Sequence, residues 1–244
     1  MTGLKKDPYL YDDVPVLRNF QNVKDKEELK KIEGDLTKMT MSIAYGQEYT
    51  KFNTDTLRHL HKTIFGCIYD WAGEFRTIMM YKHEEVLDGD SVRYAEPHNI
   101  KRELDEISKE ISKLKVSEDP KTLVFKIVRI TAAIWHTHPF REGNTRTIVA
   151  FSVLLAAKYG IEMDYSLFEK HAAYVRNALV WCTQGMYSKF EYLENIYYDA
   201  AGLLSAETEK QESEEKDYSM LGDYRVSEYK EQPHIYMEKT EKQK

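Results

Sequence analysis

Residues 136–147 read HTHPFREGNTRT, and they separate two long apolar segments of the chain. Pro139 prevents a helix from continuing through this stretch, because proline lacks an amide donor and its ring clashes with the preceding turn. Gly143 permits a tight turn, including a left-handed one. We therefore predict a loop here between two helices, the second of which begins at about Asn144.

Helical periodicity extends outward from this loop in both directions. Residues 121–137 are apolar over much of a helix circumference, which predicts a central, buried helix. The helix after the loop should end at Gly160, since glycine is typical of helix C-termini. With start signals at Asn53, Asp119 and Asp164, the pattern indicates an all-α fold built as a helical bundle. Apolar steps of three and four predict its further helices at residues 29–43, 57–71, 100–114, 164–181 and 190–203.

Residues 71–97 break the helical pattern. Within them, residues 75–81 form a short β-like run, Asp88-Gly89-Asp90 is a turn signal, and residues 91–94 suit a returning strand. An isolated hairpin is only marginally stable. We therefore expect a short β-hairpin that packs on the helical body.

The composition limits the class of protein. The 244 residues suit one domain with an extension, and their formal net charge of −6 argues against a general nucleic-acid binder. The chain shows no signal-peptide core and no apolar stretch that would span a membrane. Cys67 and Cys182 lie in apolar helical patterns without disulfide or zinc spacing. We expect a cytoplasmic protein with two buried thiols, no membrane association and no nucleic-acid partner.

The loop and the helix after it predict an anion site. The amides of Gly143, Asn144 and Thr145 would lie at a helix N-terminus, where free donors and the helix dipole attract phosphates. Arg146 follows on the first turn, where its guanidinium would bind phosphate oxygens in a forked geometry.

Acid–base and metal-binding groups flank the predicted anion site. His138 suits proton abstraction from a hydroxyl, and Glu142 would hold Mg²⁺ beside the phosphates. We expect His136, in the buried helix, to make an internal hydrogen bond instead. The loop therefore predicts phosphoryl or nucleotidyl transfer.

The same segment resembles the signature of the Fic (Fic/Doc) family, His-x-Phe-x-Asp/Glu-Gly/Ala-Asn-Gly/Lys-Arg. Residues 69–77 are similar to the family segment that leads into a β-hairpin flap, and residues 32–36 resemble its first-helix pattern. The resemblance extends over residues 17–202 and implies a Fic-like catalytic domain at 1–204, followed by a charged, tyrosine-containing extension at 205–244. The residues that match the signature are His138, Phe140, Glu142, Gly143, Asn144 and Arg146.

The resemblance implies transfer of AMP from ATP to a Ser, Thr or Tyr hydroxyl of a target protein, with Mg²⁺ present and pyrophosphate released. His138 would deprotonate the hydroxyl, and Glu142 would hold the metal against the α- and β-phosphates. The flap would bind the target as an added strand. The residues that would line this contact are Ile78, Met79 and Met80.

The resemblance also implies roles for the rest of the loop. Phe140 would anchor it from inside, and Arg146 would neutralise charge on the leaving group. The amides of Gly143 and Asn144, with the Asn144 side chain, would bind phosphate oxygens. Thr145 stands where the family has Gly or Lys, which keeps the amide and adds a branched side chain.

Val149 departs from the family pattern, because it occupies the place of a second arginine that many AMP-transferring members carry three residues after the first. In the family, that arginine holds the γ-phosphate. An alternative donor therefore stays open, so that UMP, phosphate or phosphocholine would be transferred. A catalytically silent nucleotide- or protein-binding module is the alternative outside this class.

The inhibitory family motif, Ser/Thr-x-x-x-Glu-Gly/Asn, has no copy in the chain, since Leu29 precedes Glu33 and Phe190 precedes Glu194 at the required position. We expect regulation by a partner, such as an antitoxin acting in trans, or by self-association. A toxin or secreted effector would fit this pattern. Acceptor hydroxyls for self-modification would come from the tail residues Tyr218, Tyr224, Tyr229 and Tyr236.

Overall fold

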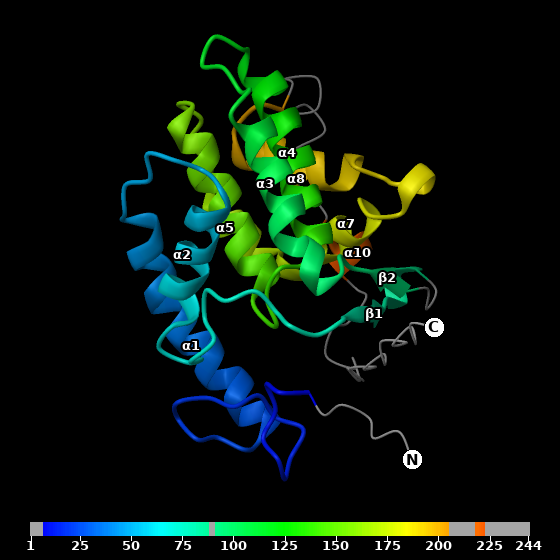
Figure 1. The fold of residues 1–244 in the computed structure, drawn as a ribbon. Coiled ribbons are helices and arrows are strands. Elements are labelled where there is room, and N and C mark those ends of the chain that lie inside the picture. The colour runs from blue at the N-terminus through cyan, green and yellow to red at the C-terminus, as the bar shows by residue number, and fades with distance from the viewer. Residues whose placement is uncertain (1–6, 88–90, 205–217, 223–244) are drawn as a thin grey trace, which may run out of the picture.

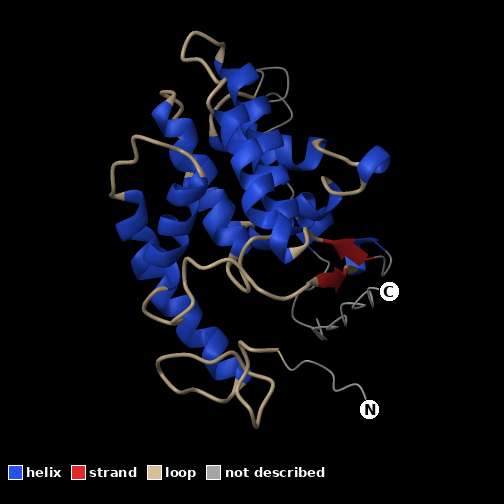
Figure 2. Ribbon diagram, in the orientation of Figure 1, coloured by secondary structure: helices blue, strands red, loops and turns tan. Residues whose placement is uncertain are grey.

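The computed structural model describes residues 7–87, 91–204 and 218–222, and these are predominantly helical (Figures 1 and 2). This confirms the all-α prediction. The helices are α1 (Lys26–Tyr45), α2 (Thr54–Phe65), α3 (Ile100–Ile111), α4 (Pro120–Thr137), α5 (Asn144–Lys158), α6 (Tyr165–Lys170), α7 (Ala172–Trp181), α8 (Glu191–Ala200) and α10 (Ser219–Gly222). Single 3-10 turns lie at η1 (Glu85–Leu87), η2 (Pro97–Asn99) and η3 (Gly185–Tyr187).

The predicted helix starts are confirmed. The Asp119 carboxylate accepts from the amides of Lys121 and Thr122 at the start of α4, and Pro120 takes the first helical position. Asn53 caps α2, and Asp164 caps α6, in the same way. No helix among the described residues is both long and apolar enough to cross a membrane.

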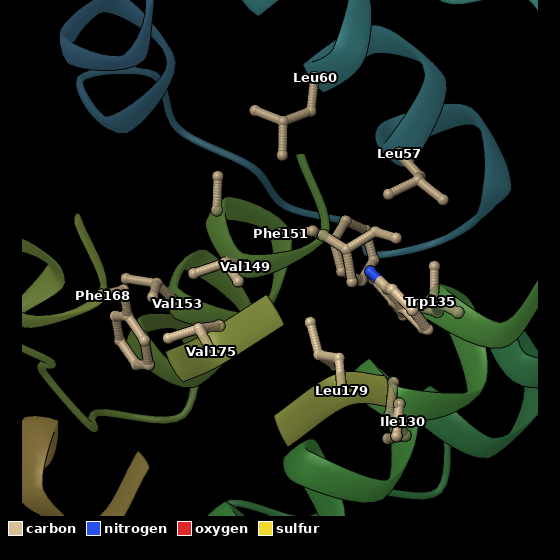
Figure 3. Close-up of a cluster of buried hydrophobic side chains, with 14 of the residues drawn as sticks. Leu57, Leu60, Ile130, Trp135, Val149, Phe151, Val153, Phe168, Val175 and Leu179 are labelled. Atoms are coloured by element: carbon tan, nitrogen blue, oxygen red, sulfur yellow. The ribbon is translucent and has the colours of Figure 1, made fainter. Parts of the chain in front are cut away.

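The core is centred on α4 and α5, which pack against each other and lie between α1 and α2 on one side and α7 and α8 on the other (Figure 1). Side chains from α2, α4, α5, α6 and α7 converge in one cluster (Figure 3). Burial of each large apolar side chain contributes about 1.5–3 kcal/mol, so this cluster holds the two helices that flank the loop. The labelled members are Leu57, Leu60, Ile130, Trp135, Val149, Phe151, Val153, Phe168, Val175 and Leu179.

The hairpin consists of β1 (Tyr81–His83) and β2 (Ser91–Arg93), paired antiparallel with Lys82 opposite Val92. The predicted first strand at residues 75–81 is therefore wrong except for its last residue. Its backbone has other partners: the Arg76 amide donates to the Pro139 carbonyl, and the Thr77 amide donates to the Tyr9 hydroxyl. Because these amides are bound to other segments, pairing begins only at Tyr81.

Three other expectations need correction. Cys67 is exposed, because α2 ends at Phe65 and the thiol lies in the turn that follows, whereas Cys182 is buried as expected. His136 is exposed on α4 rather than internal. Tyr218 is only 7% exposed and donates a 2.5 Å hydrogen bond to Asp199, so it is not available as an acceptor in this structure. Tyr224, Tyr229 and Tyr236 lie outside the described residues.

Candidate active site

The loop between α4 and α5 has two left-handed residues. His138 ends α4 with φ 49° and ψ 61°, and its amide donates to the carbonyls of Ile134 and Trp135. Gly143 has φ 77°, and a β-carbon there would lie 2.3 Å from the Phe65 ring. Glycine is therefore required both by backbone conformation and by space. The two turns direct the chain from the end of one buried helix straight into the next.

The His138 imidazole is held by aromatic rings. It stacks on Tyr94 at a centroid separation of 3.8 Å and an interplanar angle of 19°, and Trp135 contacts it edge-on at 5.5 Å. The residue is only 4% exposed. Tyr94, directly after β2, carries no functional signal in the sequence, yet it sets the plane of the ring that we expect to accept the proton.

Arg76 joins the loop to both sides of the hairpin. Its guanidinium donates to the carbonyls of His138 at 2.7 Å, Ile78 at 2.6 Å and Ala95 at 2.5 Å, with a longer contact to Thr137 at 3.4 Å. The side chain is fully buried, and burial lowers its pKa to about 10, so it remains charged at neutral pH. A lone arginine in the apolar run FRTIMM was the only sequence signal for this role.

His61 of α2 supports the other end of the loop. Its Nδ1 accepts from the Gly73 amide at 2.8 Å, so Nε2 carries the proton and donates to the Glu142 carbonyl at 3.0 Å. Burial lowers the pKa of His61 to about 3, which keeps the ring neutral as this pair of bonds requires. The ring also stacks on Phe140 at 3.8 Å. Phe140 is fully buried, as expected for an anchor.

The predicted anion site lies at the N-terminus of α5, but two of its side chains have other partners. The Asn144 amide group donates to the Phe140 carbonyl and accepts from the Phe140 amide, so it closes the loop instead of facing a phosphate. The Thr145 hydroxyl accepts from the Trp135 indole at 3.0 Å. The Gly143 amide donates to the carboxylate of its neighbour Glu142 at 2.9 Å. An arriving phosphate would compete with that carboxylate for the amide.

Arg146 is paired with an acid that the sequence did not assign to the site. Its guanidinium forms an ion pair with Glu33 of α1 and donates to the Thr37 hydroxyl at 3.1 Å. Tyr69 donates to the same Glu33 carboxylate. Burial tends to lower the pKa of Arg146, but Glu33 and Glu142 outweigh it and leave the pKa raised. The cation expected to bind phosphate thus already has a carboxylate partner.

The remaining predicted residues divide between surface and core. Ile78 and Met79 are half-buried and lie just before β1. Met80 is only 8% exposed and belongs to the hydrophobic core, which makes it a poor docking contact. Val149 is 6% exposed on α5, so an apolar packing position replaces the second arginine of the family.

The model of the Fic/DOC family matches residues 51–156, which contain the hairpin, α4 and the loop. A Sinorhizobium fredii protein named "Probable protein adenylyltransferase y4lH" is 30% identical over 167 residues, covering 67% of this chain and 82% of the relative. The chain belongs to the Fic/DOC family.

Further similar proteins include one curated relative and two solved structures. Protein adenylyltransferase VbhT of Bartonella schoenbuchensis is 26% identical over 171 residues, covering 67% of this chain but 34% of that protein, so this chain matches about a third of its length. Among solved structures, BepC of Bartonella tribocorum with bound AMPPNP has a TM-score of 0.67 at 21% identity, covering 79% of this chain and 95% of that one. The Fic domain of a Bep effector from Bartonella quintana with bound ADP also has a TM-score of 0.67, at 22% identity, covering 79% and 93%. The fold is therefore that of Fic domains.

Proposed function

We propose that this chain is a protein adenylyltransferase, which transfers AMP from ATP to a hydroxyl group of a target protein. The observation that carries the proposal is the placement of His138 at the start of the loop that leads into the N-terminus of α5. Its ring is held by Tyr94, and its backbone carbonyl is held by Arg76. The names of the relatives and the nucleotides in two similar structures support a nucleotide donor.

In the proposed reaction, the His138 imidazole accepts the proton of the target hydroxyl. The hydroxyl oxygen forms a bond to the α-phosphorus of ATP, and the bond from that phosphorus to the bridging oxygen of the β-phosphate breaks. Pyrophosphate leaves with the electron pair. The amides and dipole at the start of α5 stabilise the negative charge on the phosphates. Stacking on Tyr94 holds the imidazole in one orientation, which reduces the entropic cost of reaching the transition state.

Magnesium is part of the proposal through Glu142. The described residues contain no group of three or more His, Cys, Asp or Glu side chains that would hold a metal. Mg²⁺ is usually bound by one or two carboxylates together with substrate phosphates and water, so a single carboxylate next to the anion site fits it. When bound, Mg²⁺ would neutralise phosphate charge.

The hairpin and the region just before it are the proposed target-binding surface. A two-stranded sheet has outer edges that can accept an added strand. Ile78 and Met79, which are half-buried beside β1, would contact such a strand. Because the sequence has no copy of the inhibitory family motif, the proposed form of regulation is an inhibitory antitoxin that acts in trans. The proposed role that fits such regulation is that of a toxin or effector.

The test is intact-mass analysis of the purified protein after incubation with Mg²⁺ and each nucleoside triphosphate in turn. We expect addition of one AMP when ATP is the nucleotide, and no addition with the other nucleoside triphosphates. His136→Ala should behave like the wild type, because His136 is an exposed histidine on the same helix. His138→Ala should show no addition. Loss of metal by chelation should stop the reaction.

A different result would redirect the assignment. Transfer from UTP or another donor would replace AMP transfer with the alternative suggested by Val149. Absence of transfer together with absence of ATP binding by calorimetry would contradict the ATP-dependent reaction altogether.

A further inference from the structure

An N-terminal arm, residues 7–18, lies outside the segment that the family model matches. It folds back on itself: the Tyr11 amide donates to the Val16 carbonyl, and the Arg18 amide donates to the Tyr9 carbonyl. The arm belongs to the dark blue loops next to the start of α1 in Figure 1. Two of its contacts reach the loop between α4 and α5 and the segment just before β1.

The first contact is a buried ion pair. Asp7 Oδ2 accepts from Arg141 Nε at 3.1 Å and from Nη2 at 2.9 Å, and the two side chains are 1% and 6% exposed. Asp7 Oδ1 accepts from the Tyr9 amide at 2.9 Å. Both carboxylate oxygens are therefore used. Arg141 lies directly before Glu142 in the loop and three residues after His138.

The second contact is made by Tyr9. Its hydroxyl accepts from the Thr77 amide at 3.0 Å, and its ring packs edge-on against Trp71 at 5.4 Å. Thr77 follows Arg76, whose guanidinium binds the His138 carbonyl. The arm thus contacts two segments that meet at the loop, one through Asp7 and the other through Tyr9.

We propose that the N-terminal arm positions the loop between α4 and α5, and that Asp7 and Arg141 are positioning residues for the transfer reaction. The inference rests on the proposed function for its kinetic consequence only. A buried guanidinium without a carboxylate partner is strongly unfavourable, so without Asp7 the Arg141 side chain would move towards water. Its backbone lies between His138 and Glu142, and that movement would displace both.

The experiment compares Asp7→Asn, Arg141→Met, the double variant and Asp13→Asn. Asp13 is a matched control because it lies in the same arm but pairs with Lys24 at the surface, both side chains being exposed. Hydrogen–deuterium exchange of residues 138–146 reports loop order without reference to activity. Thermal unfolding, and kcat and KM for ATP in the transfer reaction, complete the measurements.

We expect Asp7→Asn to speed exchange in residues 138–146 and to lower kcat by about ten- to a hundredfold, since small misplacement of reacting groups has effects of that size. KM for ATP should change less than kcat, because the dipole and most of the backbone of α5 stay in place. The double variant should recover thermal stability, because it leaves no buried unpaired charge, but it should not recover kcat. Recovery of thermal stability without recovery of kcat would distinguish a positioning role from a merely structural one.

Two outcomes would overturn the proposal. One is that residues 138–146 exchange at the same rate in Asp7→Asn as in Asp13→Asn. The other is that the double variant recovers kcat as well as thermal stability. If the wild type transfers no nucleotide, the proposed function fails, while the exchange data still decide whether the arm orders the loop.

Discussion

Replacement of Arg76 by methionine tests how much of the site depends on one buried guanidinium. Three of its four hydrogen bonds to carbonyls are 2.5–2.7 Å long, and we discount the fourth at 3.4 Å as weak. Hydrogen bonds from a charged group contribute about 1.5–3 kcal/mol each, so the three sum to roughly 5–9 kcal/mol. Methionine removes the cost of burying a charge, which offsets part of this. We expect a net loss of roughly 3–5 kcal/mol in unfolding free energy.

The assay is thermal unfolding followed by circular dichroism, together with the transfer reaction below the melting temperature. For a domain of this size each kcal/mol shifts Tm by about 2–4 °C, so the fall should be roughly 6–20 °C. Arg76→Lys keeps the charge but has a single donor group, which should recover only part of the loss. The control is Arg102→Met, an exposed arginine on α3. If Arg76→Met and Arg102→Met have the same Tm, the Arg76 guanidinium does not hold the loop and the reasoning is wrong.

Two further predictions concern α2 and α1. The pKa of His61 is lowered by burial from 6.5 to about 3, so between these values the unfolded chain binds the proton and the folded chain does not. The stabilisation should therefore be fully present above pH 6.5, and the unfolding free energy should fall below that pH by up to about 1.4 kcal/mol per pH unit. Denaturant titrations of wild type and His61→Gln at pH 4.5 and 7.5 should show a smaller change of unfolding free energy with pH in the variant. An equal change in both proteins would contradict the assignment of a neutral ring. Glu33→Gln leaves the Arg146 charge without its carboxylate partner, so affinity for ATP, measured by calorimetry, should rise by about tenfold, or ~1.4 kcal/mol. Weaker binding would instead show that Glu33 orients Arg146 for the phosphate.

The helices and the loop were open to prediction because their signals are local. Asp119 and Pro120 mark the start of α4 through bonds and dihedral angles within a few residues. The motif residues from His138 to Arg146 are likewise adjacent in the chain. The strand predicted at residues 75–81 begins too early for the opposite reason, because the amides of Arg76 and Thr77 donate to groups 63 and 68 residues away in the chain.

Local signals are enough to predict the helical class, the position of the loop and the residue types that suit phosphate chemistry, because periodicity, caps and motifs each involve residues that are close in the chain. The partner of each of these residues, in contrast, depends on how the helices pack. Arg141 pairs with Asp7, which lies 134 residues away in the sequence, and Arg146 pairs with Glu33, which lies 113 residues away. Buried polar groups must be satisfied by whichever groups packing brings within reach. That requirement selects partners by proximity in space, and proximity over such separations follows from the packing of the helices.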